Sequence, residues 1–141
     1  MKQIFVDTFY WIALCNQRDQ WHQQVVSFSQ QLKGVKLVTS DAVLNELLNY
    51  YAQFGSEMRL GVSQRTREIL RNKNIQVITH TREVFIEGLD LYANRLDKGY
   101  SLTDCMSMII MDRLKITEIL THDKHFTQEG FLILFQGERN V

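Results

Sequence analysis

The sequence has no proline, two cysteines, no excess of charge of either sign and no long apolar run. Without proline, the turns must be built from Gly, Asn, Asp and Ser residues. The 16 basic and 16 acidic side chains cancel, so the whole molecule has no general attraction for polyanions or anionic membranes. Any contact with nucleic acid must therefore be local.

The short apolar runs also exclude a membrane span and a signal peptide. No stretch approaches the roughly 18 consecutive apolar residues of a transmembrane helix, and only Lys2 precedes the first apolar run, unlike the charged start of a signal peptide. We therefore expect a cytoplasmic protein with no membrane partner. Cys15 and Cys105 form no CxxC pair, and we interpret both as small buried hydrophobic residues.

The chain length favours one domain. With 141 residues, of which 45% are hydrophobic, the chain can bury one sizeable core and is too short for two. We find no internal repeat and no low-complexity tract. A single domain over residues 1–141 is therefore predicted.

Short β-branched apolar runs alternate with longer stretches whose apolar residues recur at helical intervals. We predict strands at 3–6, 35–38, 75–78, 118–120 and 131–135. We predict helices at 20–32, 41–54, 59–72, 82–96 and 104–114. Strands separated by helices imply parallel neighbours and right-handed crossovers, so the fold class is α/β, with helices on both faces of one sheet.

Small residues mark the helix boundaries. Ser40, Thr81 and Thr103 stand where an N-cap hydroxyl is expected before a helix. Gly34 and Gly55 follow helical stretches, as glycines at helix C-termini do.

Four acidic residues fall at positions suited to a site. In an open parallel sheet, ligands bind beyond the carboxyl ends of the strands. Asp7 and Asp123 follow strands at that end, Asp104 lies in the first turn of a helix, and Glu46 lies one to two turns into the helix after the second strand. Singly, each has a structural explanation as a turn former, a dipole partner or a solvated helical residue.

Together the four acids have a common chemical use. Mg²⁺ and Mn²⁺ prefer oxygen ligands, and four carboxylates in one pocket would repel one another strongly without a cation. Several nearby hydroxyls could hold the acids or a metal-bound water by hydrogen bonds. These belong to Thr8, Ser101, Thr103 and Thr121.

Four segments resemble, in order, the four motifs of the PIN domain and especially of VapC-type toxins. They are "FVDTFYWIAL", "TSDAVLNELLN", "YSLTDCMSMIIM" and "ILTHDKHF". The family's motif acids match Asp7, Glu46, Asp104 and Asp123, and Thr8 fills the hydroxyl position after the first aspartate. The sequence departs from the pattern in its bulky aromatics after Thr8 and in His125, which stands where some members have another acid.

The resemblance implies a fold and a function. The fold is a three-layer, PIN-like α/β domain with a five-stranded parallel sheet flanked by helices. The function is that of an endoribonuclease, which binds Mg²⁺ or Mn²⁺ through the four acids and cuts RNA to leave a 5′-phosphate and a 3′-hydroxyl. It also implies a toxin of a type II toxin–antitoxin pair, with a small antitoxin protein as partner and a homodimer as the working unit.

Other readings are less favoured. A zinc site from His122, His125 and Cys105, with His80 or His22 as a further ligand, lacks the second closely spaced ligand pair of structural zinc sites. His125 could instead touch a substrate phosphate. Phosphoacceptor receiver domains and DxDxT phosphotransferases need acids where this chain has none. The basic stretch 59–73 is more typical of a solvated helix face than of a phosphate-binding patch. A PIN-like module that binds RNA or a partner without cutting remains the alternative function.

Overall fold

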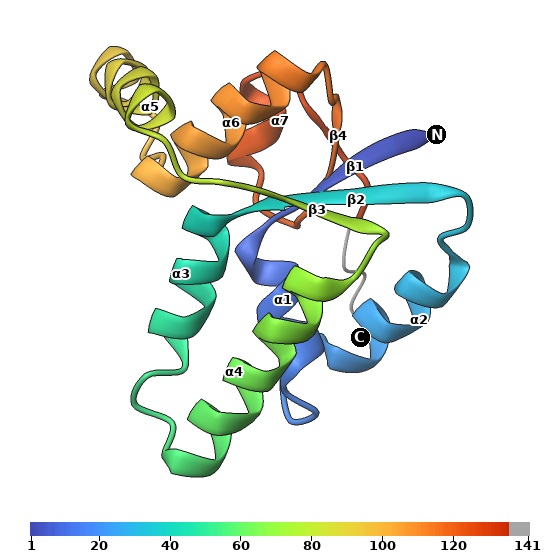
Figure 1. Cartoon of the computed structure of the whole chain (residues 1–141). Coiled ribbons are helices and arrows are strands. Elements are labelled where there is room, and N and C mark those ends of the chain that lie inside the picture. The colour runs from blue at the N-terminus through green and yellow to red at the C-terminus, as the bar shows by residue number, and fades with distance from the viewer. Residues whose placement is uncertain (136–141) are drawn as a thin grey trace.

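The computed structural model describes residues 1–135 and contains one sheet of five parallel strands in the order β3-β2-β1-β4-β5 (Figure 1). The strands are β1 (Lys2–Val6), β2 (Val35–Ser40), β3 (Ile75–Ile78), β4 (Glu118–Leu120) and β5 (Leu132–Ile133). All four pairings are parallel, as the alternation of strands and helices predicts. The strand segments expected from the sequence are confirmed, with β1 and β2 slightly longer and β5 shorter.

Helices cover both faces of the sheet. They are α1 (Thr8–Cys15), α2 (His22–Gln31), α3 (Asp41–Tyr50), α4 (Ser56–Arg71), α5 (Arg82–Asn94), α6 (Leu102–Leu114) and α7 (His125–Gln128). Figure 1 shows α1, α2 and α4 on one side of the sheet and α6 and α7 on the other. This arrangement confirms the predicted three-layer α/β fold. Among residues 1–135, no helix combines the length and the hydrophobicity needed to span a bilayer.

Two of the three expected N-caps are confirmed. The hydroxyl of Ser40 accepts a hydrogen bond from the Val43 N–H at 3.2 Å, and that of Thr81 accepts one from the Val84 N–H at 3.1 Å. Both bonds satisfy a helix-terminal donor that has no intrahelical partner. The expected cap at Thr103 is wrong, because α6 begins at Leu102 and is capped by the preceding residue.

The two glycine helix ends were placed wrongly. Helix α2 already ends at Gln31, and Gly34, with φ of +67°, lies in the turn that leads into β2. Helix α3 ends at Tyr50, and Gly55, with φ of +96°, is the residue before α4 rather than the end of α3. Both glycines occupy the left-handed region that other residues rarely adopt. Each therefore marks a turn, but the turn leads into the next element and does not end the preceding helix.

Two helices have no periodic signal in the sequence. Helix α1 is apolar on almost every side and packs against α2, α3 and α4, so it shows no amphipathic stripe. Helix α7 has four residues, too few to show a helical period. Both helices begin immediately or shortly after an acidic residue of the predicted site.

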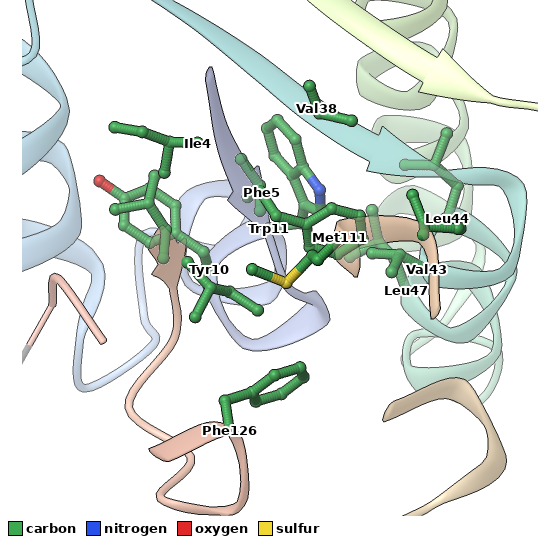
Figure 2. Packing of buried hydrophobic residues seen from close by; sticks show 14 of the residues in the cluster. Ile4, Phe5, Tyr10, Trp11, Val38, Val43, Leu44, Leu47, Met111 and Phe126 are labelled. Carbon is green, nitrogen blue, oxygen red and sulfur yellow. The ribbon is translucent and has the colours of Figure 1, made fainter. Parts of the chain in front are cut away.

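The core draws buried residues from β1, β2, β4, α1, α3, α6 and α7, among other elements, and Figure 2 shows the rings of Tyr10 and Trp11 among buried apolar side chains. The polar atoms of these rings are satisfied. Trp11 Nε1 donates to Thr39 Oγ1 at 3.1 Å, and that hydroxyl donates to the Val6 carbonyl at 3.0 Å. The Tyr10 hydroxyl donates to the Val25 carbonyl at 3.1 Å. These bonds fix α1, and with it the end of β1, to its neighbours.

Close packing of α5 on α6 gives a stability prediction. A Cβ at buried Gly88 would lie 2.6 Å from Met106 Cγ and 3.3 Å from its backbone nitrogen. We expect Gly88→Ala to lower the free energy of unfolding by about 1–3 kcal/mol through overpacking, as measured by urea denaturation. Gly61→Ala in α4 is the matched control, because nothing lies within 4 Å of its Cβ position, and we expect it to stabilise by roughly 0.5–1 kcal/mol. Equal gains from both variants would contradict the close contact.

Candidate metal centre

The carboxyl ends of β1 and β4 meet the first turns of α1 and α6 in a pocket of about 850 Å³. All four acids predicted from the sequence line it. They are Asp7, Glu46, Asp104 and Asp123. The structure therefore brings together residues that are separated by up to 116 positions in the chain (123 − 7). The parallel pairing of β1 with β4 places the residues that follow these two strands side by side.

Asp7 directly follows β1 and occupies the N-cap position of α1, yet its side chain does not cap the helix. Instead, its Oδ2 accepts a hydrogen bond from the Thr121 hydroxyl at 2.9 Å. Burial and the negative charge of Asp104 raise the pKa of Asp7 to about 7, although hydrogen bonds from Thr8 and Thr121 lower it. The carboxylate is therefore held in a setting that disfavours its charge.

Asp104 is fixed by a reciprocal cap at the start of α6. Its N–H donates to the Ser101 hydroxyl at 3.0 Å, and its Oδ2 accepts from the Ser101 N–H at 3.1 Å. Burial, followed by the charges of Asp123 and Glu46, raises the pKa of Asp104, against the lowering effect of the Ser101 bonds. A residue that could have been a simple dipole partner is thus part of a capping box that also faces the pocket.

Asp123 lies in the turn between β4 and α7. Its N–H donates to Thr121 Oγ1 at 3.1 Å, and its Oδ1 accepts from the His125 N–H at 2.9 Å. This is the local turn bonding that aspartate commonly makes. The same turn leaves the carboxylate partly exposed on the pocket wall, so the turn role and a ligand role are compatible.

Glu46 reaches the pocket from α3 and is partly exposed. Its negative charge contributes to the raised pKa values of both Asp7 and Asp104. Electrostatic coupling to two other acids is not expected of an isolated, solvated helical residue. The coupling is evidence that Glu46 belongs to the same group of charges.

The imidazole of His125 lies beside Asp104 and Asp123. Its Nδ1 lies 3.2 Å from Asp123 Oδ1 and 3.6 Å from Asp104 Oδ2. Within residues 1–135, these three side chains form the one cluster of three or more histidine, cysteine or acidic ligands whose atoms lie within 4.8 Å of one another. The alternative zinc set is not assembled in this part of the chain, since His122 instead contacts the rings of Phe9 and Trp21 and Cys105 is buried in α6.

The supporting hydroxyls are placed unequally. Thr121 is fully buried beneath the acids and bridges Asp7 to the Asp123 backbone. Thr8 lines the pocket, and its buried hydroxyl has no hydrogen-bond partner in residues 1–135. Thr103 does not line the pocket, whereas Ser101 does. The predicted support from Thr103 therefore has no geometric basis.

The residues present fit a hard divalent cation. Carboxylate oxygens are the ligands that Mg²⁺ and Mn²⁺ prefer. Burial and, to a smaller extent, neighbouring acids raise the pKa values of Asp7 and Asp104, and a bound cation would favour their charged forms. The unpartnered Thr8 hydroxyl is available to a ligand or water in the same pocket.

Sequence reasoning missed the residues that pack behind His125. Tyr100 is buried, and its ring packs edge to face on that of His125, with the two ring centroids 5.3 Å apart. The Tyr100 hydroxyl donates to Glu129 Oε2 at 3.0 Å, and Arg95 donates to both Glu129 oxygens at 3.1 Å. The Arg95 hydrogen bonds lower the pKa of Glu129. These residues lie in different segments, so no local pattern in the sequence links them.

A model of the PIN domain matches residues 4–132. No curated protein matches the chain. Three similar solved structures are VapC20 of Mycobacterium tuberculosis, described as a sarcin-ricin loop cleaving toxin, FitAcB of Neisseria gonorrhoeae, and VapBC2 of Rickettsia felis bound to a promoter DNA fragment.

The three structures differ in how closely they resemble the chain. VapC20 is 23% identical with a TM-score of 0.81, over 92% of this chain and 96% of that one. FitAcB is 15% identical with a TM-score of 0.64, over 94% and 96%. VapBC2 is 13% identical with a TM-score of 0.63, over 93% and 96%. At these identities the likeness is one of fold.

Proposed function

The chain belongs to the PIN domain family, and from this premise we propose that it is a metal-dependent endoribonuclease, formed by a single PIN-like domain over residues 1–141. Residues 136–141 of that domain lie outside the described part. The observation that carries the proposal is the convergence of four acids on one pocket, with two of their pKa values raised. Buried carboxylates that repel one another cost stability, and a bound cation would offset that cost and attract an anionic substrate.

In this proposal the four acids bind Mg²⁺ or Mn²⁺, which would acidify a coordinated water and offset the charge on the phosphate oxygens. The residues around the cation provide orientation. Thr121 holds one oxygen of Asp7, and the Ser101 N–H holds one oxygen of Asp104, so both carboxylates are fixed on the pocket wall. The free hydroxyl of Thr8 can position a water there. Cleavage would leave a 5′-phosphate and a 3′-hydroxyl.

We further propose that the protein is the toxin of a type II toxin–antitoxin pair in the cytoplasm. The fold likeness to the toxin VapC20 and to the FitAcB and VapBC2 assemblies supports this role. A small antitoxin protein would then be its partner, and a homodimer its working unit.

Metal removal tests the nuclease proposal. We expect the purified protein to cut single-stranded RNA in Mg²⁺ or Mn²⁺, to stop cutting in excess EDTA, and to regain activity when the cation is restored, because the carboxylates alone cannot offset phosphate charge. Gel analysis of end-labelled RNA measures both the rate and the end groups. Cutting that persists in EDTA would contradict the proposal. Binding of RNA with no cutting in either cation would favour the non-catalytic PIN-like module.

A further inference from the structure

The pocket that holds the acids has an aromatic wall, formed by the rings of Phe9, Trp21 and His122. We call these three residues the ring cluster. The ring centroids of Phe9 and His122 lie 4.0 Å apart, those of Trp21 and His122 lie 5.1 Å apart, and those of Phe9 and Trp21 lie 6.0 Å apart. Phe9 and Trp21 are half-buried and His122 is exposed, so the cluster is open to the pocket.

The ring cluster is tied to the acids by the backbone. Phe9 is two residues after Asp7 in the first turn of α1, and His122 stands between Thr121 and Asp123. The Thr121 hydroxyl bonds both Asp7 Oδ2 and the Asp123 N–H, at 2.9 and 3.1 Å. The two segments that present the acids therefore also present two of the rings, at a fixed separation.

The third ring is held from the other side. Trp21 precedes α2, and its backbone N–H donates to Asp19 Oδ1 at 2.8 Å. Buried Phe135 backs the cluster, with its ring centroid 5.7 Å from that of Phe9 and 6.2 Å from that of Trp21. The cluster thus rests on the core while it lines the pocket.

A purely structural role explains the ring cluster incompletely. Phe9 and Trp21 pack on the core, but a core extension does not require an exposed imidazole at its outer edge. His122 covers apolar rings with a polar one that can stack and still face water. Lys124, which is also exposed, lines the same pocket and supplies a cation near the acids.

We propose that the ring cluster is a stacking subsite for one unpaired nucleobase of an RNA whose neighbouring phosphodiester is held at the acids. This inference rests on the proposed nuclease function and adds a subsite for a base beside its metal centre. Aromatic side chains stack on the face of any base, and sequence-tolerant recognition of single strands commonly uses them. Bases inside a duplex are already stacked, so a single-stranded or splayed nucleotide is the species that fits.

The test measures binding without cleavage. The probe is a fluorescein-labelled oligouridine RNA of eight nucleotides, compared with versions that carry one abasic nucleotide at each position in turn. Fluorescence anisotropy at low ionic strength gives the affinity in Ca²⁺, a hard cation with oxygen ligands that lets the acids hold a phosphate, and a gel of the same samples checks that the RNA is intact. We expect the parent to lose about tenfold in affinity when one particular base is removed, since a stacked base is worth roughly that factor or more.

The variant Trp21→Leu/His122→Ala is expected to bind the intact RNA about tenfold more weakly than the parent and to lose little more when the same base is removed. Phe28→Leu is the matched control, because this ring packs on Phe135 at 5.6 Å but does not line the pocket; its affinity should equal that of the parent. A second readout is tryptophan fluorescence: Trp11 is buried in the core, so quenching by RNA reports Trp21.

The outcomes separate the subsite from the nuclease proposal. Equal affinity of the parent for intact and abasic RNA, no measurable affinity, or an unchanged affinity of the double variant overturns the subsite. If the parent still cuts RNA in Mg²⁺ in those cases, the nuclease proposal stands. If base-dependent binding is found but no cation supports cutting, the subsite stands and the nuclease proposal fails.

Discussion

Asp7→Asn and Asp104→Asn are each expected to abolish RNA cleavage while the protein keeps its fold. Asn has the same shape as Asp but lacks the charge that binds a hard cation. Asp7 and Asp104 are the two buried acids of the pocket. Cleavage rates with end-labelled RNA in Mg²⁺ and in Mn²⁺ measure the effect.

Stability in EDTA shows whether either variant has simply unfolded. The pKa of Asp7 is raised by burial to about 7, above its value of about 3.9 in the unfolded chain. Between these pH values the folded state binds the extra proton, so the parent loses stability as the pH rises from about 4 to about 7. Asp7→Asn removes this loss, and we expect it to melt at a higher temperature than the parent at pH 8. Added Mg²⁺ should raise the melting temperature of the parent more than that of the variant.

Asp41→Asn is a matched control outside the pocket. This acid starts α3 and accepts a hydrogen bond from the His80 N–H at 3.0 Å, but it does not line the pocket. Its substitution should leave cleavage unchanged. Cleavage at the parent rate by Asp7→Asn or Asp104→Asn would end the four-acid assignment.

The sequence was sufficient for the fold because two signals agree along most of the chain. Strand-like runs such as 75–78 and hydroxyl caps such as Ser40 mark where strands end and helices begin. Alternation then leaves parallel pairing as the simple solution. Helix α1 escaped detection because it is buried on nearly all sides and has no polar face. The cap of α6 was misplaced because Ser101 and Thr103 are both suitable residues, and only geometry selects Ser101.

For the candidate site, the sequence predicts which acids are involved but not the contacts that hold them. The positions of Asp7 and Asp123 after strands could be predicted, because topology brings those strand ends together, and the resemblance to the PIN motifs added Glu46 and Asp104, which lie on helices. The contacts that hold the acids could not be predicted, since they join distant segments. Thr121 to Asp7 spans 114 positions, and Tyr100 to Glu129 spans 29. The ring cluster was missed for the same reason: Phe9 and His122 look like unrelated residues until β1 and β4 are paired.

Thr121→Val is expected to weaken metal binding and cleavage by about 10- to 100-fold, the usual cost of losing a residue that orients a ligand. Valine fills the same buried space, but it cannot donate to Asp7 Oδ2 or accept from the Asp123 N–H. Without the hydroxyl that lowers it, the pKa of Asp7 rises further, and two acids lose their common anchor.

Calorimetric titration with Mn²⁺ measures the affinity, and single-turnover cleavage measures the rate. Thr121→Ser keeps the hydroxyl and should retain most of both. Thr66→Val is the matched control, because the buried Thr66 hydroxyl donates only to the Val62 carbonyl within α4 and lies outside the pocket; its loss should change stability but not Mn²⁺ affinity. If Thr121→Val binds Mn²⁺ as tightly as Thr121→Ser, the Thr121 hydroxyl serves only the fold. The orientation of Asp7 must then come from burial alone.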